Sequence, residues 1–104
     1  MDLESFGSKK RVTLELTNRI NQNKEDIVTY RAEIEEAKRQ MAEIEKTAGK
    51  YEHAEAKQTA EQMLGNLRDT IASHELMIKE AEEHIADYQS QLLEEMEDTG
   101  SKPN

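Results

Sequence analysis

The chain has 104 residues, of which 35% are hydrophobic and 36% are charged, and its formal net charge is −9. With one Phe and no Trp, it contains too little apolar side-chain volume for a compact globular core, which leaves a seam-packed helical rod or a disordered chain. The absence of cysteine excludes disulfides, thiolate metal sites and a cysteine nucleophile.

The first element predicted along the chain is a helix over about residues 9–48. Residues 1–8 read as a flexible lead-in without the apolar core of a secretory signal, and Ser5 or Ser8 is a candidate cap for a helix that begins near Lys9. No Pro or Gly follows until Gly49, which stands just after the basic Lys46, as is typical of a helix C-terminus.

Apolar residues recur in this first helix at alternating spacings of four and three, the heptad pattern of a helix that packs along a narrow seam. A coiled-coil seam needs only about two apolar residues in seven, so the pattern favours a rod over disorder. The seam residues predicted here are Leu16, Ile20, Ile27, Tyr30, Ile34, Met41 and Ile44.

A turn over about residues 49–52 leads to a second predicted helix over about 53–97. Its seam residues are Leu64, Leu67, Ile71, Ile78, Ile85, Tyr88 and Leu92. Gly65 lies within this helix, where it is either a flexible point or a second break. Residues 98–104 hold the only proline and are predicted to be a disordered tail.

The two seams are out of phase with each other. If the heptad register of the first helix continued through the turn, the charged Glu55 would occupy a core position. The register of the second helix is shifted from it by two residues, whereas the usual insertions in coiled coils shift the register by three or four. Folding back at Gly49–Lys50 removes the mismatch, because it places residues such as Ile34 and Leu67 opposite each other. We therefore predict an all-α fold, an antiparallel two-helix coiled-coil hairpin. A parallel dimer of one long bent helix is the alternative.

Further apolar residues of the second helix lie off its seam. They form candidate protein-interaction positions, because methionine suits an adaptable docking face. The candidates are Met63, Leu76, Met77, His84, Leu93 and Met96. They predict a homodimer in which two hairpins form a four-helix bundle. Docking of another protein's helix is one alternative, and apolar residues scattered over the surface are the other.

No pattern in the sequence predicts chemistry. Phosphate-binding, nucleophile-elbow and metalloprotease motifs are absent, and no two histidines have the helical spacing of a metal site. We expect no catalytic, cofactor-binding or metal-binding residue and no enzyme. His74 falls in the seam, where it is either a tolerated core-edge histidine or, once charged below about pH 6.5, a cation that loosens the packing.

The negative charge is concentrated in one half of the chain. Residues 1–48 carry nine basic and ten acidic residues, whereas residues 49–104 carry five and thirteen. The acidic half should repel phosphate backbones and anionic lipid, so we expect no direct nucleic-acid binding. No apolar run has the length of a membrane span, and we expect a cytoplasmic protein, or one inside a virion or host cell if the chain is viral.

A few residues resemble a known family. Tyr30, Gly49, Tyr51 and the run Lys57–Glu61 are similar to tubulin-binding cofactor A, a family of small helical chaperones. That family has a third helix and a proline inside its second helix, and this chain has neither, so we assign it to no family.

The sequence thus favours a non-enzymatic protein–protein interaction module, such as an adaptor, an assembly factor or a small chaperone, that acts through a helical hairpin. A small acidic inhibitor, virus-encoded for example, that blocks a nucleic-acid-handling protein is one alternative. A structural spacer or filament subunit is the other.

Overall fold

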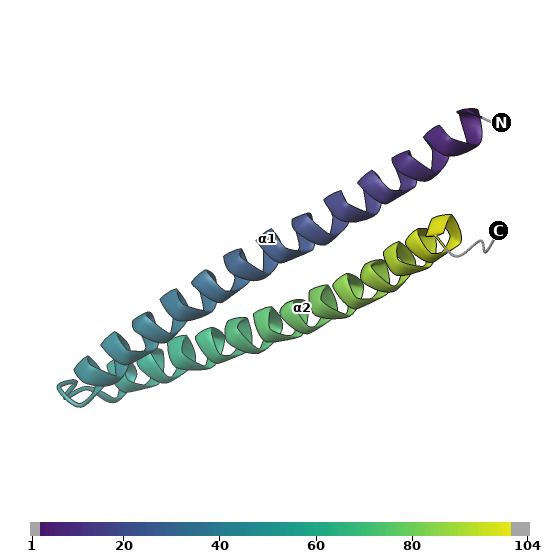
Figure 1. Cartoon of the computed structure of the whole chain (residues 1–104). Helices are drawn as coiled ribbons and strands as arrows, with labels where there is room; N and C mark the ends of the chain where they lie inside the picture. Colours follow the sequence, from purple (N-terminus) through teal and green to yellow (C-terminus); the bar gives the residue numbers. More distant parts are fainter. Residues whose placement is uncertain (1–2, 101–104) are drawn as a thin grey trace. The chain divides into compact units, whose positions relative to one another are not determined.

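A computed structural model of the chain describes the backbone of residues 3–100 and the side chains of residues 10–96. Over this range the chain forms two long helices and no strand: α1 (Leu3–Ala48) and α2 (Ala54–Gly100) (Figure 1). The helices pack as a hairpin, and the predicted all-α antiparallel hairpin is therefore confirmed.

Both helices extend further toward the ends of the chain than the sequence pattern predicted. Helix α1 begins at Leu3 rather than near Lys9, so Ser5 and Ser8 lie within the helix and not at its start. The one glycine in this stretch, Gly7, costs a helix only about 1 kcal/mol relative to alanine, which does not stop propagation from the long helix behind it.

Helix α2 likewise extends beyond its predicted C-terminal end. The helix continues to Gly100, whereas the apolar spacing predicted an end at Glu97. The interpretations of residues 1–2 as part of a flexible lead-in and of residues 101–104 as part of a disordered tail lie outside the described residues.

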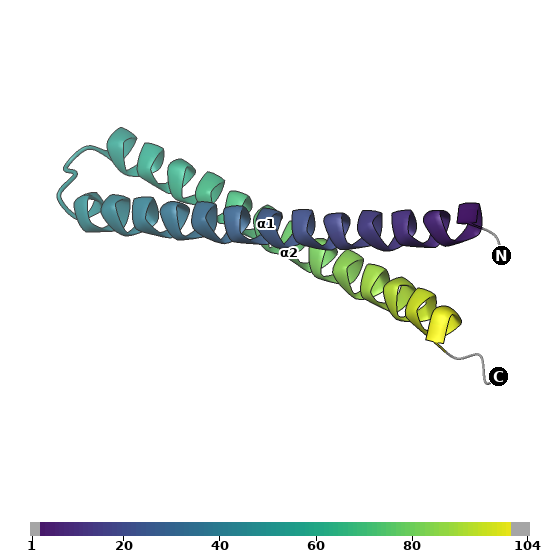
Figure 2. The ribbon, with the colours of Figure 1, turned by 45° about the horizontal axis from the view of Figure 1, so that its top comes forward.

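The turn between the helices follows the predicted break closely (Figure 2). At the end of α1, the Lys50 N–H donates to the Thr47 carbonyl at 2.9 Å and the Tyr51 N–H donates to the Ala48 carbonyl at 3.2 Å. At the start of α2, the His53 carbonyl accepts from the Lys57 N–H at 3.2 Å. No glycine of the described backbone has a positive φ, so Gly49 ends α1 without a left-handed cap.

Gly65, by contrast, does not interrupt α2, which is continuous from Ala54 to Gly100. A Cβ atom built at Gly65 would meet nothing within 4 Å, so close packing does not require the glycine. The helix tolerates it because one glycine costs about 1 kcal/mol and a helix of this length has many other bonds to hold it.

The hairpin divides into two units, each of which joins a segment of α1 to a segment of α2. Unit 1 comprises Met1–Ile27 and Glu80–Asn104, and unit 2 comprises Val28–Lys79 with the turn. The buried apolar residues are Leu16, Ile20, Ile27 and Ala81 in unit 1 and Ile34, Ala37 and Ala60 in unit 2.

The remaining residues that the heptad pattern assigns to the seam are half-buried. They are Tyr30, Met41, Ile44, Leu64, Leu67, Ile71 and Ile78 in unit 2, and Ile85, Tyr88 and Leu92 in unit 1. No large side chain among the described residues is completely buried. The chain by itself therefore has a thin core, as expected where each helix buries only one narrow stripe.

Candidate interaction surface

Helix α2 carries a row of uncharged residues beside its seam. The row lies within unit 2, and its members are alternately three and four residues apart, so they share one face of the helix. We call this row the uncharged stripe, and its residues are Ala56, Thr59, Met63, Asn66, Thr70, Ser73 and Met77. Ala56 is half-buried and the other six are exposed, with 48% of Met63 and 38% of Met77 accessible to solvent.

The two threonine hydroxyls of the uncharged stripe are already hydrogen-bonded within α2. Thr59 Oγ1 donates to the Glu55 carbonyl at 3.0 Å, and Thr70 Oγ1 donates to the Asn66 carbonyl at 3.0 Å. Another helix could cover these side chains without leaving their donors unpaired, which is the main cost of burying a hydroxyl. The stripe is therefore less costly to desolvate than its composition suggests.

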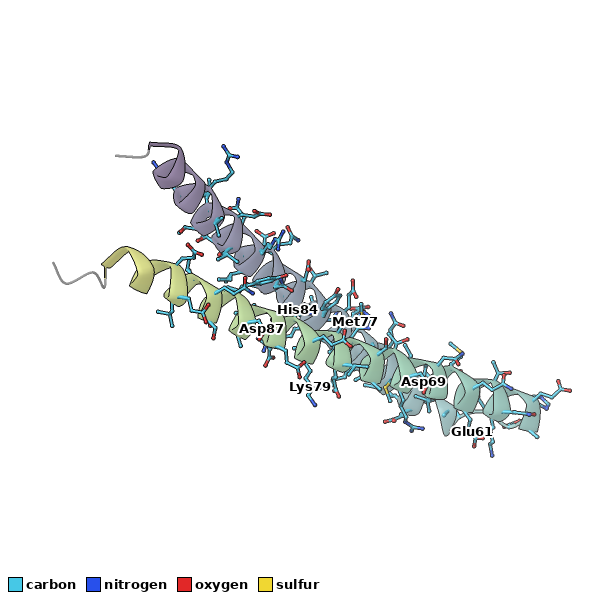
Figure 3. All side chains as sticks on the ribbon, turned by 90° about the vertical axis from the view of Figure 1, so that its right-hand side faces the viewer. Glu61, Asp69, Met77, Lys79, His84 and Asp87 are labelled. Carbon is cyan, nitrogen blue, oxygen red and sulfur yellow. The ribbon has the colours of Figure 1, made fainter. Side chains whose placement is uncertain are left out.

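Other exposed sides of α2 are charged. Glu61, Asp69 and Lys79 lie along the unit 2 part of the helix and Asp87 along its unit 1 part, and all four are exposed (Figure 3). The uncharged stripe thus gives α2 one face in unit 2 on which a partner meets no formal charge of this helix.

The six predicted interaction residues are exposed, but they fall in different units. Met63 and Met77 belong to the uncharged stripe, and Leu76 lies in the same unit beside Met77 in the sequence. Unit 1 contains the other three, which are His84, Leu93 and Met96. The His84 ring lies 6.3 Å from the ring of Tyr88, measured between centroids.

The sequence predicted only Met63 and Met77 of the uncharged stripe as interaction residues. Ala56, Thr59, Asn66 and Ser73 are small or polar, so an analysis of apolar spacing passes over them. The signal that identifies them is an absence of charge, repeated at helical spacing, in a chain where 36% of residues are charged.

A second feature of unit 2 is a polar contact between the helices at His74. The Nδ1 atom of His74 lies 2.8 Å from the Thr70 carbonyl oxygen of its own helix, and Nε2 contacts the Glu33 carboxylate of α1. The His74 ring also meets the Tyr30 ring of α1 edge-on, with 5.7 Å between centroids and 81° between planes. The His74 side chain is 19% exposed, so the contact sits at the margin of the seam.

These neighbours favour the charged imidazole. The hydrogen bond with the Thr70 carbonyl, followed by the hydrogen bond with Glu33 and the negative charge of its carboxylate, raises the pKa of His74 above its ordinary value of 6.5, while partial burial opposes this. These contacts therefore run against the alternative in which a charged His74 loosens the packing. Glu33 supplies a counter-charge from across the seam that heptad spacing alone did not reveal.

The described part of the chain shows neither a cluster of metal ligands nor a membrane-spanning helix. Among residues 10–96 no group of three or more His, Asp or Glu side chains is placed to hold a metal ion. Neither helix, over its described length, has an apolar stretch that could cross a membrane. No known protein family, curated protein or solved structure matches the chain.

Proposed function

We propose that the protein is a cytoplasmic, non-enzymatic protein–protein interaction module, and that a second copy of the chain is the partner that fits the uncharged stripe. Two hairpins would then form a four-helix bundle, which serves as an adaptor or assembly factor. The observation that carries the proposal is the stripe itself, a helical row of seven residues without a formal charge in a chain with a net charge of −9.

The surface area of the chain supports a dimer. One chain exposes 8167 Å². A compact monomer of 12.0 kDa would expose about 6,000 Å² by the usual scaling of area with mass. The excess is larger than the roughly 800 Å² that each partner of a standard interface buries. The hairpin therefore exposes enough surface area to bury a standard interface on association.

The sizes of the side chains also support pairing of the stripe with itself. In an antiparallel arrangement that places Asn66 opposite Thr70 of the second copy, helical spacing puts Met63 opposite Ser73 and Met77 opposite Thr59. Each methionine thus meets a small residue, and large residues facing small ones pack without gaps or overlap. A two-fold axis produces every such pair twice, as a closed dimer requires.

Charge favours this face over the rest of α2. Two identical acidic chains repel each other, and a close approach through Glu61, Asp69 or Asp87 would add like charges at short range. A partner with a strong positive charge would prefer those acidic sides. An identical chain is best accommodated where no formal charge is present, which on α2 in unit 2 is the uncharged stripe.

The test is the mass of the particle in solution, measured by light scattering over a range of concentrations. The chain should be a dimer, and the double variant Met63→Glu, Met77→Glu should be a monomer because the interface would bury four carboxylates without a counter-charge. The matched control is Ala72→Glu, Ala86→Glu, which adds the same charge to exposed positions of another face of α2 and should remain a dimer.

Circular dichroism should show that all three chains are equally helical, which ensures that the comparison concerns association only. A chain that is monomeric at millimolar concentration, or a methionine variant that still dimerises, would contradict the proposal. Growth of the wild-type chain into open-ended assemblies would also contradict it and would favour a filament subunit.

A further inference from the structure

We propose that His74 and Glu33 form a pH-sensitive latch that holds α1 against α2 in unit 2 when the imidazole is protonated and releases it when the imidazole is neutral. The latch is a property of a single hairpin. Its test is therefore independent of the proposed dimer and of the role of the uncharged stripe.

The geometry requires two donors on the imidazole ring. Nδ1 of His74 faces the carbonyl oxygen of Thr70 at 2.8 Å, and Nε2 faces a carboxylate oxygen of Glu33. Both partners can only accept hydrogen bonds, and a neutral imidazole carries a single N–H. Only the imidazolium form, with an N–H on each nitrogen, satisfies both contacts at once.

Loss of the proton weakens the contact between the helices in either neutral tautomer. A neutral ring can keep its N–H on Nδ1, where it donates to the Thr70 carbonyl within α2. The lone pair of Nε2 then points at the negatively charged Glu33 and repels it. If the proton instead stays on Nε2, the ring loses its bond to Thr70 and its fixed orientation. In either tautomer the neutral state is left with one unfavourable contact.

The groups around the ring set the direction of the response. The titratable side chains that the structure places against His74 from α1 are Glu33 and Tyr30, and α2 contributes the Thr70 carbonyl. The carbonyl bond, the Glu33 bond and the Glu33 charge raise the pKa of His74 above 6.5. The stabilisation from protonation is therefore complete below about pH 6.5 and disappears as the pH rises through the raised pKa of the folded state.

The first arm of the test measures the urea midpoint of unfolding for the full chain at pH 6 and at pH 9, at one protein concentration. Carboxylates stay ionised throughout this interval, so they contribute little to the difference. The wild-type midpoint should be higher at pH 6. The variant His74→Gln retains His53 and His84 and should lose a clear part of the difference, because it cannot gain a second donor or a charge.

The second arm keeps the proposal testable if His74→Gln folds poorly. It follows the ring resonances of His74 by NMR as the pH changes in the wild-type chain, in Glu33→Gln and in the control Glu36→Gln. Glu36 is a carboxylate of the same helix that binds Arg39 at 2.7 Å, so its loss tests for a general charge effect. Glu33→Gln should lower the pKa of His74 toward its ordinary value, and Glu36→Gln should leave it unchanged.

Two results would overturn the latch. One is a His74 that titrates at its ordinary pKa in the wild-type chain and does not respond to Glu33→Gln. The other is a urea midpoint whose difference between pH 6 and pH 9 is the same in wild type and in His74→Gln.

Discussion

The guanidinium group of Arg19 on α1 lies over the ring of Tyr88 on α2, with the Cζ atom 5.8 Å from the ring centroid. The same group donates to the Glu15 carboxylate one turn earlier at 2.7 Å, which holds its position over the ring. In unit 1 the Arg19 side chain therefore joins the two helices at the edge of the seam.

This contact predicts a measurable coupling between the two residues. In a double-mutant cycle with Arg19→Ala and Tyr88→Leu, we expect a coupling free energy of about 0.5–1 kcal/mol, the range of cation–π contacts at exposed sites. The unfolding free energy of the four chains supplies the measurement. Arg39, which binds Glu36 within α1, is the control, and Arg39→Ala combined with Tyr88→Leu should be additive. Equal couplings for Arg19 and Arg39 would refute the contact.

A second prediction separates the seam from the outer surface of α1. Ile34 is 7% exposed and Val28 is 67% exposed, and both belong to unit 2. Ile34→Ala should lower the free energy of unfolding by about 2–5 kcal/mol, since it removes buried methyl groups and leaves a cavity. Val28→Ala should change it by less than about 0.5 kcal/mol, as is usual at the surface. Similar losses in both variants, measured by urea unfolding, would show that the seam is wrongly placed.

A third prediction concerns the glycine inside α2. Gly65→Ala should stabilise the chain by about 1 kcal/mol, because the glycine lies in a continuous helix and a Cβ there meets nothing within 4 Å. Gly49→Ala is the matched control, because a Cβ there also meets nothing within 4 Å, but that residue lies outside both helices. Its gain should be smaller. A loss of stability at Gly65 would instead indicate that a partner approaches the helix there.

The hairpin was predictable because it depends on a periodic property of many residues. The seams of the two helices each repeat over several heptads, so single exceptions such as His74 do not obscure the period. The phase mismatch between the seams indicated that the chain folds back, and Gly49 after Lys46 indicated where the turn lies. Helix ends were less predictable, since one glycine and two serines near the N-terminus only weakly oppose helix propagation.

Individual side-chain contacts were not predictable in the same way. Heptad spacing placed His74 in the seam, but it did not identify the carboxylate of Glu33, which lies beside the seam and reaches the ring by its own rotamer. The uncharged stripe differs in this respect, because its small and polar members leave no apolar period but do show an absence of charge at helical spacing. Contacts that depend on the rotamer of one side chain leave no such periodic signal.

The most direct test of the proposed dimer uses spin labels and the absence of native cysteine. A single cysteine replaces Asp69, beside the middle of the uncharged stripe, or Asp87, further along α2 (Figure 3). Packed helices lie about 8–10 Å apart, so labels at residue 69 of two copies should be within about 30 Å of each other. Labels at residue 87 should be about 50 Å further apart, because antiparallel helices separate by twice the 1.5 Å rise per residue. Short distances at both positions, or no intermolecular distance at residue 69, would contradict the account.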